Sequence, residues 1–408
     1  MKIVRIIARL NVGGPARHVV WLTKELQTDE FSSVLLTGTV PEGEEDMSYF
    51  AKEHEVEPIF IEEMSRELSP QDAVSLWKVF RQIRSEKPDI IHTHTAKAGT
   101  IGRVAGLLYR WLTWKTFLGK PRRVRLVHTY HGHVFHSYYG KSKTRIFLFI
   151  EKTLARFATD KIIVISKQQF TEIHKNFGVG QKRQFEIVPL GIDLAPFQDW
   201  RERKNILRRE IGASDEEILV GIVGRLTEIK NISLFLKTAK LYEERKSVDF
   251  PRLKFIIVGD GNLRTELEAE VETLNIKDVV KFLGNRNDTA VFYAGLDIVA
   301  LTSLNEGTPL SLIEAMANEK AIISTSVGGV VDLLGEIQTE TDGYKICERG
   351  VRAGSNDAEG FYNGLIYLAK DVASRVASGA KGKIFVEENY SKERLIRDIK
   401  QLYRKLRV

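Results

Sequence analysis

The sequence predicts an α/β protein built from two doubly wound domains. Short apolar runs alternate with amphipathic segments along most of the chain, and the same alternation starts a second time at Leu219. Strands that are followed regularly by helices favour a parallel sheet covered on both faces. The 408 residues suffice for two domains of about 200 residues each. We expect these domains at 1–195 and 196–390, joined by a charged linker within 194–217.

The first domain is expected to contain seven strands and at least four helices. Its first strand ends before the turn Gly13-Gly14-Pro15, and its fourth leads into His92-Thr93-His94. The strands are expected at 2–8, 31–36, 56–61, 89–91, 125–129, 161–165 and 186–189, and the helices at 16–26, 71–85, 97–106 and 144–157.

The second domain repeats this pattern, with strands expected at 219–223, 253–258, 279–283, 295–300 and 321–324. After the strand 295–300 the chain breaks at Asn305-Glu306-Gly307. It restarts as a helix, with Thr308 as the expected N-cap and Pro309 as the first helical residue. A basic amphipathic helix is expected at 391–406, and residues 391–408 are expected to pack back on the first domain.

Positive charge is concentrated in the first half of the chain. Residues 1–200 contain 29 Lys/Arg and 22 Asp/Glu, whereas residues 201–408 contain 32 of each. The stretch 90–150 holds eleven Lys/Arg, six His and no acidic residue. This asymmetry predicts an anionic partner for the first half: a membrane surface, a phosphorylated substrate or nucleic acid.

Composition also excludes several classes of protein. Cys347 is the only cysteine, so we expect no disulfide framework and no cysteine-based metal site, as is typical of a reducing cytosol. No apolar run approaches the roughly 20 residues of a membrane span. The first ten residues, MKIVRIIARL, are interrupted by two arginines and predict a strand, not a signal peptide.

The candidate functional residues repeatedly follow the expected strands. They are Gly13, Gly14, His92, His94, His131, Arg225, Gly259 and Glu306. Ligands of open α/β sheets bind beyond the carboxyl ends of the strands. We therefore expect two domains whose strand ends gather these residues into one cleft.

The residue types point to a nucleotide diphosphate and a sugar. Arg225 and Lys230 offer a forked donor and a point charge, which together suit a diphosphate. Glu306, in a strand-to-helix turn, is expected to accept hydrogen bonds from neutral hydroxyls. Glu314 lies in an otherwise apolar run and needs donors, which a sugar or ribose diol would supply. For each of these residues in isolation, a solvated side chain is the better explanation.

The glycine-rich turns do not favour a dehydrogenase. Gly13-Gly14 lets the backbone approach a ligand closely, but neither it nor Gly259-Asp260-Gly261 completes the G-x-G-x-x-G fingerprint of dinucleotide-binding domains.

Seven motifs carry a family resemblance. They are Gly13-Gly14, HTHTAKAG at 92–99, His131-Gly132, VPLGID at 188–193, GRLTEIKN at 224–231, VGDG at 258–261 and EGTPLSLIE at 306–314. In this order and spacing the chain resembles the GT-B glycosyltransferases of family 4, the retaining group 1 enzymes, over nearly its whole length. The resemblance implies two Rossmann-like domains that face each other across a cleft.

The resemblance also implies roles for single residues. Arg225 and Lys230 look like the diphosphate ligands, Glu314 like the acid that binds the ribose, and Glu306 like the acid that faces the donor sugar. His131 matches the histidine of the N-terminal domain near the reacting centre. We take His131, Glu306, Arg225 and Lys230 as the expected catalytic set. The remaining implied donor-binding residues are Gly13, Gly14, Gly224, Gly259, Asn285, Arg286, Gly307, Thr308, Pro309 and Leu310.

We expect no metal and no cofactor. The Asp-X-Asp motif of metal-dependent GT-A transferases occurs nowhere in the chain. His92 and His94 would share one face of a strand, but as a metal pair they lack a third ligand, so a structural or acceptor-contact role is preferred. His128, His133 and His136 are interpreted in the same way. No side chain presents itself as a nucleophile, and retention in the family is usually explained by same-face attack assisted by the leaving phosphate.

One segment departs from the family pattern. After Gly106 this chain inserts LLYRWLTWKTFLGKPRRVR. The stretch Arg103–Arg125 contains seven Lys/Arg and no acid, with Trp111, Trp114 and Phe117 at near-helical spacing. A basic helix with interfacial aromatic residues is typical of binding to an anionic membrane. A helix that packs its tryptophans into the domain is the alternative.

The expected function is a retaining, metal-independent hexosyltransferase. It would move a hexose or N-acetylhexosamine from a nucleotide diphosphate sugar, with a UDP-sugar favoured, to a hydroxyl of a lipid-linked or saccharide acceptor. The expected setting is bacterial surface-polysaccharide assembly, such as capsule, exopolysaccharide or lipopolysaccharide, at the cytoplasmic face of the membrane. The alternatives are a GT-B sugar-nucleotide epimerase and a nucleic-acid-binding protein, and the basic stretch contains no recognised nucleic-acid module to support the latter.

Overall fold

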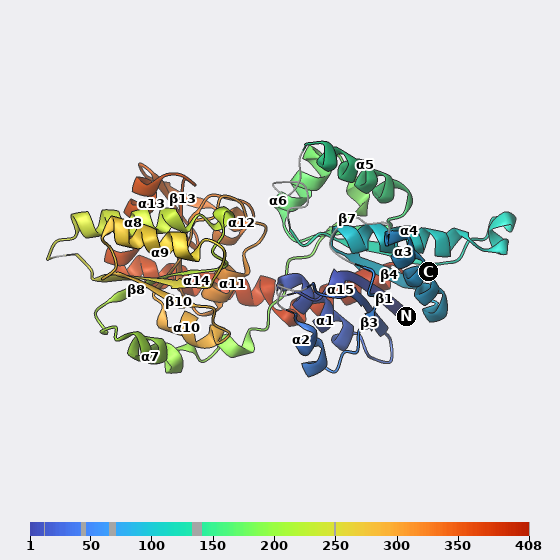
Figure 1. Ribbon diagram of the computed structural model, residues 1–408, viewed down its shortest axis with the longest axis horizontal. Helices are drawn as coiled ribbons and strands as arrows, with labels where there is room; N and C mark the ends of the chain where they lie inside the picture. Colours follow the sequence, from blue (N-terminus) through green and yellow to red (C-terminus); the bar gives the residue numbers. More distant parts are fainter. Residues whose placement is uncertain (12, 42–45, 65–70, 133–140, 249, 408) are drawn as a thin grey trace. The chain divides into compact units, whose positions relative to one another are not determined.

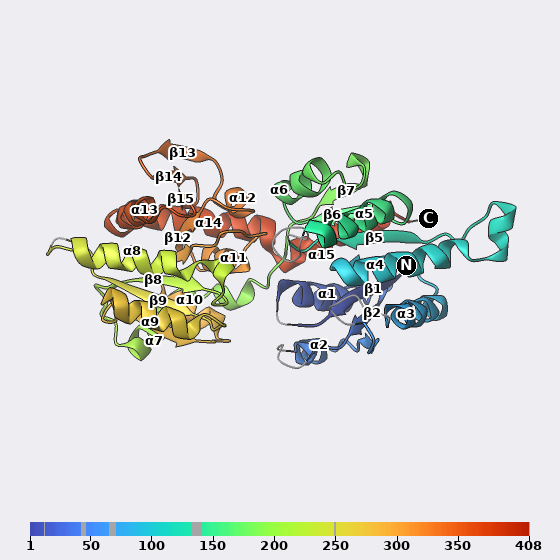
Figure 2. The same ribbon diagram turned by 45° about the horizontal axis from the view of Figure 1, so that its top comes forward.

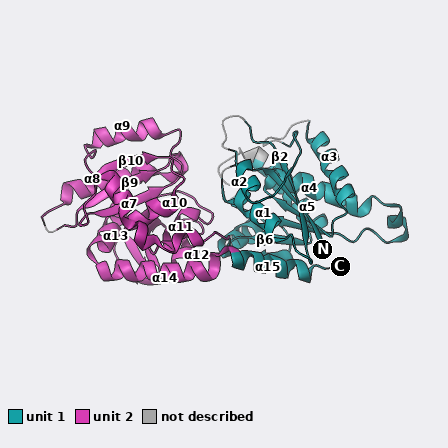
Figure 3. Cartoon of the chain, turned by 90° about the horizontal axis from the view of Figure 1, so that it is seen from below, with its two compact units in different colours: residues 1–190, 393–408 teal, residues 191–392 magenta. Residues whose placement is uncertain are grey.

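The computed structural model describes residues 1–11, 13–41, 46–64, 71–132, 141–248 and 250–407. The chain forms two compact units, shown in separate colours in Figure 3. Unit 1 comprises Met1–Leu190 and Glu393–Val408, and unit 2 comprises Gly191–Lys392. His133 and His136 lie outside the described residues.

Unit 1 is built on a parallel sheet of seven strands in the order β3-β2-β1-β4-β5-β6-β7 (Figure 1). Each strand overlaps a strand expected from the sequence. The bounds are β1 Lys2–Arg9, β2 Ser32–Gly38, β3 Ile59–Phe60, β4 Ile90–His94, β5 Arg125–Thr129, β6 Lys161–Val164 and β7 Phe185–Ile187.

Helices cover both faces of this sheet, as doubly wound sheets require. They are α1 Gly14–Glu25, α2 Ser48–Glu53, α3 Asp72–Glu86, α4 Ala96–Trp111, α5 Lys141–Phe157, α6 Lys167–Phe170 and α15 Lys392–Lys405, with short turns η1 Trp114–Leu118, η2 Thr171–Asn176 and η3 Lys182–Gln184. Successive residues of β1 serve opposite faces: Val4 packs with helices α3 and α4, and Ile3 packs with α1 and α15. Leu395 and Ile399 of α15 are fully buried there, so the C-terminal helix returns to unit 1 as expected.

Unit 2 contains a sheet of eight strands in the order β10-β9-β8-β11-β12-β15-β14-β13. The strands are β8 Ile218–Val223, β9 Leu253–Val258, β10 Val280–Gly284, β11 Ile298–Leu301, β12 Ala321–Thr325, β13 Ile337–Glu340, β14 Tyr344–Cys347 and β15 Gly350–Ala353. The first five overlap the expected strands. The last three strands pair with one another in antiparallel fashion at the edge of the sheet. The sequence pattern did not indicate the outermost strand, β13, because it is exposed along its whole length.

The helices of unit 2 also cover both faces of its sheet (Figure 2). They are α7 Trp200–Ile211, α8 Ile232–Arg245, α9 Arg264–Leu274, α10 Thr289–Gly295, α11 Leu310–Ala317, α12 Val330–Leu334, α13 Ala358–Lys370 and α14 Val372–Tyr390, with turns η4 Ala195–Phe197 and η5 Glu228–Lys230.

The expected linker at 194–217 is wrong, because most of it is helix α7 of unit 2. Leu207 and Ile211, one turn apart, are buried beneath its charged face. Arg208 is also buried, and its guanidinium pairs with Asp297 at 2.9 Å. The charge content that suggested a linker therefore belongs to an amphipathic helix with one internal ion pair.

The expected basic helix after Gly106 is also wrong in form. Helix α4 ends at Trp111, and a separate 3-10 turn, η1, holds Trp114 and Phe117. Arg103 lies inside the unit, where it is fully buried and pairs with Glu151 at 2.6 Å. The two tryptophans are exposed, so the alternative in which they pack into the domain does not hold.

No helix among the described residues is both long and apolar enough to cross a membrane.

Candidate active site

Both sheets have a topological switch point, where the chain leaves a central strand in opposite directions. In unit 2 this point lies between β8 and β11, and in unit 1 between β1 and β4. Such points are the usual ligand sites of open α/β sheets. Some of the expected functional residues, among them His94, Lys230 and Glu306, end or follow the strands that border these points, whereas His131 and Gly259 follow the next strands of the sheets.

In unit 2 a lysine and a glutamate meet across the switch point. Lys230, at the end of the turn after β8, places its ammonium 2.5 Å from Oε1 of Glu306, in the loop after β11. Ser303 donates a hydrogen bond to the same carboxylate oxygen at 2.6 Å. Both charged side chains are mostly buried, so the pair is fixed in position. Two of the three expected catalytic residues of this unit, Lys230 and Glu306, are thus in direct contact.

The backbone holds the two loops together. The Leu304 amide donates to the Ile229 carbonyl, and the Thr302 hydroxyl donates to the Lys230 carbonyl, both at 2.9 Å. These two hydrogen bonds hold the loop after β11 against the loop after β8. The Lys230 side chain lies over Gly224, because a Cβ built at Gly224 would stand 3.9 Å from Nζ.

Two glycines allow the loops to pack this closely. Gly259 has φ of 132°, and a Cβ there would lie 2.0 Å from the Gly224 carbonyl oxygen. A Cβ at Gly328, after β12, would lie 1.7 Å from the Glu306 carbonyl oxygen. The Gly329 amide then donates to the Gly307 carbonyl at 2.7 Å. Glycine is therefore required at 259 and 328, because any side chain there would push the neighbouring loops apart.

The helix after Glu306 begins one residue later than the sequence indicated. Helix α11 starts at Leu310, and Pro309, with an extended backbone, occupies the N-cap position. Thr308 is not the cap, because the extended backbone of Pro309 leaves Pro309 itself outside the helix. Its buried hydroxyl has no hydrogen-bond partner among the described residues. The amide groups of the first turn of α11 face the same sheet edge as Glu306, which favours an anionic ligand there.

Glu314 lies in the second turn of α11, half-buried and close to Tyr293. Burial and then the negative charge of Glu314 raise the pKa of the Tyr293 hydroxyl well above its ordinary value. A protonated Tyr293 hydroxyl next to Glu314 is a hydrogen-bond donor towards that carboxyl group.

The two other basic residues expected to bind the donor, Arg225 and Arg286, differ in their surroundings. Arg225 is exposed and has no ion pair among the described residues. Arg286, next to Asn285 after β10, is held by Glu210 at 2.5 Å and Asp288 at 2.6 Å, and these hydrogen bonds raise its pKa. Arg225 is thus available to a ligand, whereas the guanidinium of Arg286 is engaged; a role for 285–286 at the nucleotide base stays a prediction.

Unit 1 gathers histidines at its own switch point. His94 ends β4, His131 follows β5, and His18 lies on α1, which begins directly after the N-cap Gly13. Nδ1 of His94 and Nε2 of His131 are 2.9 Å apart, and the rings of His18 and His131 meet edge to face. Gln169 donates to the Gly132 carbonyl at 2.9 Å and so fixes the loop that carries His131.

A second layer supports this cluster. His92, two residues before His94 on the same face, contacts the Tyr403 hydroxyl of α15 at 2.6 Å and the Thr129 hydroxyl at 2.7 Å. Thr95, directly after His94, has φ of 66°, which is strained for a β-branched residue. The turn that presents His94 is therefore held by tertiary contacts and not by local preference.

Three of these imidazoles have the spacing to hold a metal ion. One ring nitrogen from each of His18, His94 and His131 lies within 4.8 Å of the others. The third possible ligand, which the sequence pattern did not reveal, is thus His18. His92 does not belong to this group of three. Burial lowers the pKa of His18 most, and positive charge on His131, His92, Arg5 and Arg394 would lower it further, so the surrounding charge opposes a cation. The three imidazoles are instead suited to hydrogen bonding with hydroxyl groups.

The histidines are held in their neutral form. Burial lowers the pKa of His18, His92, His94 and His128 well below 6.5, and it lowers the pKa of His131 to about 4. A neutral imidazole can donate one hydrogen bond and accept another. The cluster is therefore suited to orienting hydroxyl groups near neutral pH.

Comparison with known proteins decides the family. Residues 12–196 match the model described as Glycosyltransferase Family 4, and residues 203–385 match the model described as Glycosyl transferases group 1.

The chain is a glycosyltransferase of family 4, group 1.

Relatives and solved structures agree with this assignment. The chain is 29% identical over 351 residues to the UDP-Gal:alpha-D-GlcNAc-diphosphoundecaprenol alpha-1,3-galactosyltransferase of Escherichia coli, covering 85% of this chain and 84% of that one. It is 26% identical to the N-acetyl-alpha-D-glucosaminyl L-malate synthase of Bacillus anthracis, covering 82% and 79%. The structure of Anabaena HepE in complex with UDP superposes with a TM-score of 0.78, at 18% identity, over 99% of this chain and 100% of that one, and shows the shared GT-B fold.

Sequence reasoning missed several residues of this glycosyltransferase. Ser303 anchors the Glu306 carboxylate and Thr302 anchors the Lys230 carbonyl, but a hydroxyl next to a strand end is too common to stand out. His18 and Tyr403 belong to helices far along the chain from His94. Their only sequence signal is a polar residue on an otherwise apolar helix face.

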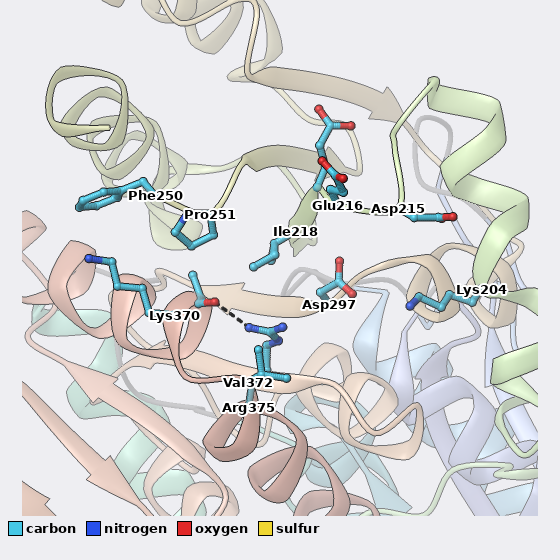
Figure 4. A pocket seen from close by; sticks show the side chains of 12 residues that line it. Lys204, Asp215, Glu216, Ile218, Phe250, Pro251, Asp297, Lys370, Val372 and Arg375 are labelled. Atoms are coloured by element: carbon cyan, nitrogen blue, oxygen red, sulfur yellow. Dashed lines mark hydrogen bonds between the residues drawn. The ribbon is translucent and has the colours of Figure 1, made fainter. Parts of the chain in front are cut away.

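A hollow of about 510 Å³ lies at the opposite edge of the unit 2 sheet of the glycosyltransferase. It is lined by Ile218, which begins β8, and by Asp297, which precedes β11 (Figure 4). Arg375 in this hollow donates to the carbonyls of Leu368 and Ala369, at 2.8 Å each. The hollow therefore lies at the amino ends of the strands, away from Lys230 and Glu306.

The neutral histidines predict a pH-dependent stability of the glycosyltransferase. Each has a lower pKa in the folded chain than its unfolded value of about 6.5. Their contribution to stability is therefore fully present above about pH 6.5 and is lost as the pH falls towards about 4. We expect the melting temperature to fall between about pH 7 and pH 5, as measured by calorimetry, and to fall less in His18→Asn. Equal melting temperatures at the two pH values would contradict buried neutral imidazoles.

Proposed function

We propose that this enzyme transfers a hexose or N-acetylhexosamine from a UDP-sugar to a hydroxyl group of a lipid-linked or saccharide acceptor, with retention at the anomeric carbon. The substrate class is supported by the relatives, one of which is named for a UDP-galactose donor and a diphosphoundecaprenol-linked acceptor. A similar enzyme of Campylobacter jejuni, 38% identical over 121 residues, is also named for a undecaprenol-linked substrate. The reaction belongs to polysaccharide biosynthesis.

One observation carries this proposal: the Lys230–Glu306 pair at the switch point of unit 2. Lys230 and the exposed Arg225 supply two positive charges at a sheet edge that also receives the first amide groups of α11. We assign the donor diphosphate to these groups. Glu306 then accepts hydrogen bonds from the donor-sugar hydroxyls, and Glu314 accepts them from the ribose. Gly13, Gly14 and His131 are assigned to the reacting end of the substrates.

The chemistry requires one bond to break and one to form. The bond between the anomeric carbon and the diphosphate oxygen breaks, and the electron pair leaves with UDP. The acceptor oxygen bonds to the same face of that carbon, and its proton passes to the leaving phosphate oxygen. Arg225 and Lys230 stabilise the charge that develops on the diphosphate. His131, neutral near pH 7, orients a hydroxyl by hydrogen bonding.

We propose that transfer needs no metal ion. In this assignment, the charge that a divalent cation would neutralise is met by Arg225, Lys230 and the N-terminus of α11. Each of these groups is covalently part of the chain and remains in place in chelator.

We propose that the enzyme binds peripherally to a membrane surface, as a lipid-linked acceptor would require. The segment that follows α4 supports this proposal, because it exposes aromatic and basic side chains. The relatives named for undecaprenol-linked substrates support it as well.

Thermal shift with nucleotides is the direct test. UDP at about 100 times its dissociation constant should add about 2.7 kcal/mol and raise the melting temperature by a few degrees. GDP and ADP serve as controls, and the same shift should be seen with chelator present. UDP should be released from a UDP-sugar only when an acceptor is added. A shift with none of these nucleotides would contradict the proposal, and turnover of a UDP-sugar without acceptor would favour an epimerase.

A further inference from the structure

The segment between α4 and β5 forms a projection of unit 1. The chain leaves α4 at Trp111, passes through η1 and returns at Arg125, and in Figures 1 and 2 it extends well beyond the sheet. Large apolar side chains are exposed on this projection. Phe117 is 94% exposed, Trp114 68%, Leu112 64% and Leu118 63%. So many exposed apolar residues within eight positions mark an interaction surface.

A basic hollow of about 820 Å³ lies at the base of the projection. Its charged lining residues are Lys87, Asp89, Arg110, Lys115, Lys120, Arg122, Arg123 and Arg125. Asp89 is the only acid among them. The hollow therefore has a strong positive potential on a surface that the aromatic side chains border.

Internal partners neutralise only part of this charge. Arg110 and Arg125 both pair with Asp160. Lys87, Lys115, Lys120 and Arg123 are exposed and have no ion pair within the described part of the chain. At least four cations thus remain available to a ligand.

One further cation is held in place without an acid. Arg122 donates to the Tyr109 carbonyl at 2.6 Å and to the Leu112 carbonyl at 3.3 Å, and it stacks over the Tyr109 ring at 4.7 Å. These contacts fix the guanidinium but leave its charge uncompensated. A fixed guanidinium among exposed lysines is suited to phosphate.

We propose that this hollow binds the phosphate groups of anionic lipids while Trp114 and Phe117 enter the interfacial region of the bilayer. This inference deepens the proposed function, on which it rests for the membrane setting, by naming the lipid class and the residues that bind it. The apolar and basic groups lie on one projection, so both can engage the same surface. Electrostatic attraction and apolar burial would then add to each other.

Two double variants test the two components. Lys120→Glu/Arg123→Glu reverses two charges in the hollow, and Trp114→Ser/Phe117→Ser removes the exposed rings. The matched controls are Lys52→Glu/Lys182→Glu, two exposed lysines elsewhere on unit 1, and Trp77→Ser, an exposed tryptophan of α3. The full-length protein is sedimented with vesicles of phosphatidylcholine alone, or of phosphatidylcholine and phosphatidylglycerol in equal parts.

We expect binding only to the vesicles with phosphatidylglycerol. Since each basic residue near an anionic surface contributes about 1 kcal/mol, charge reversal should lower the partition coefficient at least about 30-fold, and the control pair should lower it far less. The ring variant should also bind less, whereas Trp77→Ser should bind like the wild type. Soluble glycerol phosphate should compete only weakly.

Four results would overturn the proposal. They are equal binding to both vesicle types, a charge-reversed variant that behaves like its control, glycerol phosphate binding tighter than vesicles, and binding to duplex DNA but not to vesicles. UDP-induced thermal shifts of the same variants are measured in parallel. A loss of vesicle binding with an intact UDP shift separates this inference from the proposed transfer, and an absent UDP shift with intact vesicle binding would reject only the latter.

Discussion

Arg225→Ala is expected to weaken UDP binding by about 10- to 100-fold, because a charge-assisted contact of a guanidinium with phosphate contributes about 1.5–3 kcal/mol. The side chain is exposed, so the free energy of unfolding of the ligand-free protein should stay within about 0.5 kcal/mol of wild type. Calorimetric titration with UDP gives the dissociation constant directly.

Arg252→Ala is the matched control for this result. Arg252 is an exposed arginine of the same unit that precedes β9, at the amino edge of the sheet. We expect it to bind UDP like the wild type. Wild-type affinity for UDP in Arg225→Ala would remove the diphosphate assignment, whereas equal losses in both variants would point to a non-specific effect of charge.

Lys230→Ala is expected to lower kcat/KM for sugar transfer by about 100- to 1,000-fold. Removing one preorganised group that stabilises the developing charge of a leaving group typically has this effect. The change also removes the Lys230 ammonium from Glu306, whose Oε1 still accepts the hydrogen bond from Ser303. We therefore expect a loss of about 1–2 kcal/mol in the free energy of unfolding as well.

A second ion pair of unit 2 separates stability from catalysis. Lys254 pairs with Glu217 at 3.1 Å, and its side chain is 27% exposed, close to the 23% of Lys230. Lys254→Ala should lose comparable stability and keep its transfer rate. If both variants lose transfer equally, the effect of Lys230→Ala is one of folding, and Lys230 has no special role at the diphosphate.

Much of the fold follows from local pattern. Strands buried on both faces, such as β8 and β9, stand out as apolar runs, because every residue must avoid water whichever face it occupies. The exposed edge strand β13 lacks that signal and was missed. The sequence of helix α7 resembles a linker because its buried stripe is narrow and includes Arg208, whose partner Asp297 lies 89 residues away.

The site was predicted in part. Lys230 and Glu306 could be named because each follows a strand, and strand ends are where ligands bind. Their contact could not be predicted, nor the anchoring of Glu306 by Ser303. The third histidine, His18, was missed because α1 turns it towards His131 only after helix and sheet have packed.

The sequence by itself thus determined the order of strands and helices and the polar residues that follow each strand, because burial and turn chemistry act over a few neighbouring residues. Tertiary structure alone decided which strands became neighbours. Parallel pairing requires a long crossover, so β8 lies between β9 and β11 although β9 and β10 intervene in the chain before β11. That arrangement brings Lys230 to Glu306, 76 residues away in sequence, and the same rule brings His94 to His18 and His131 in unit 1.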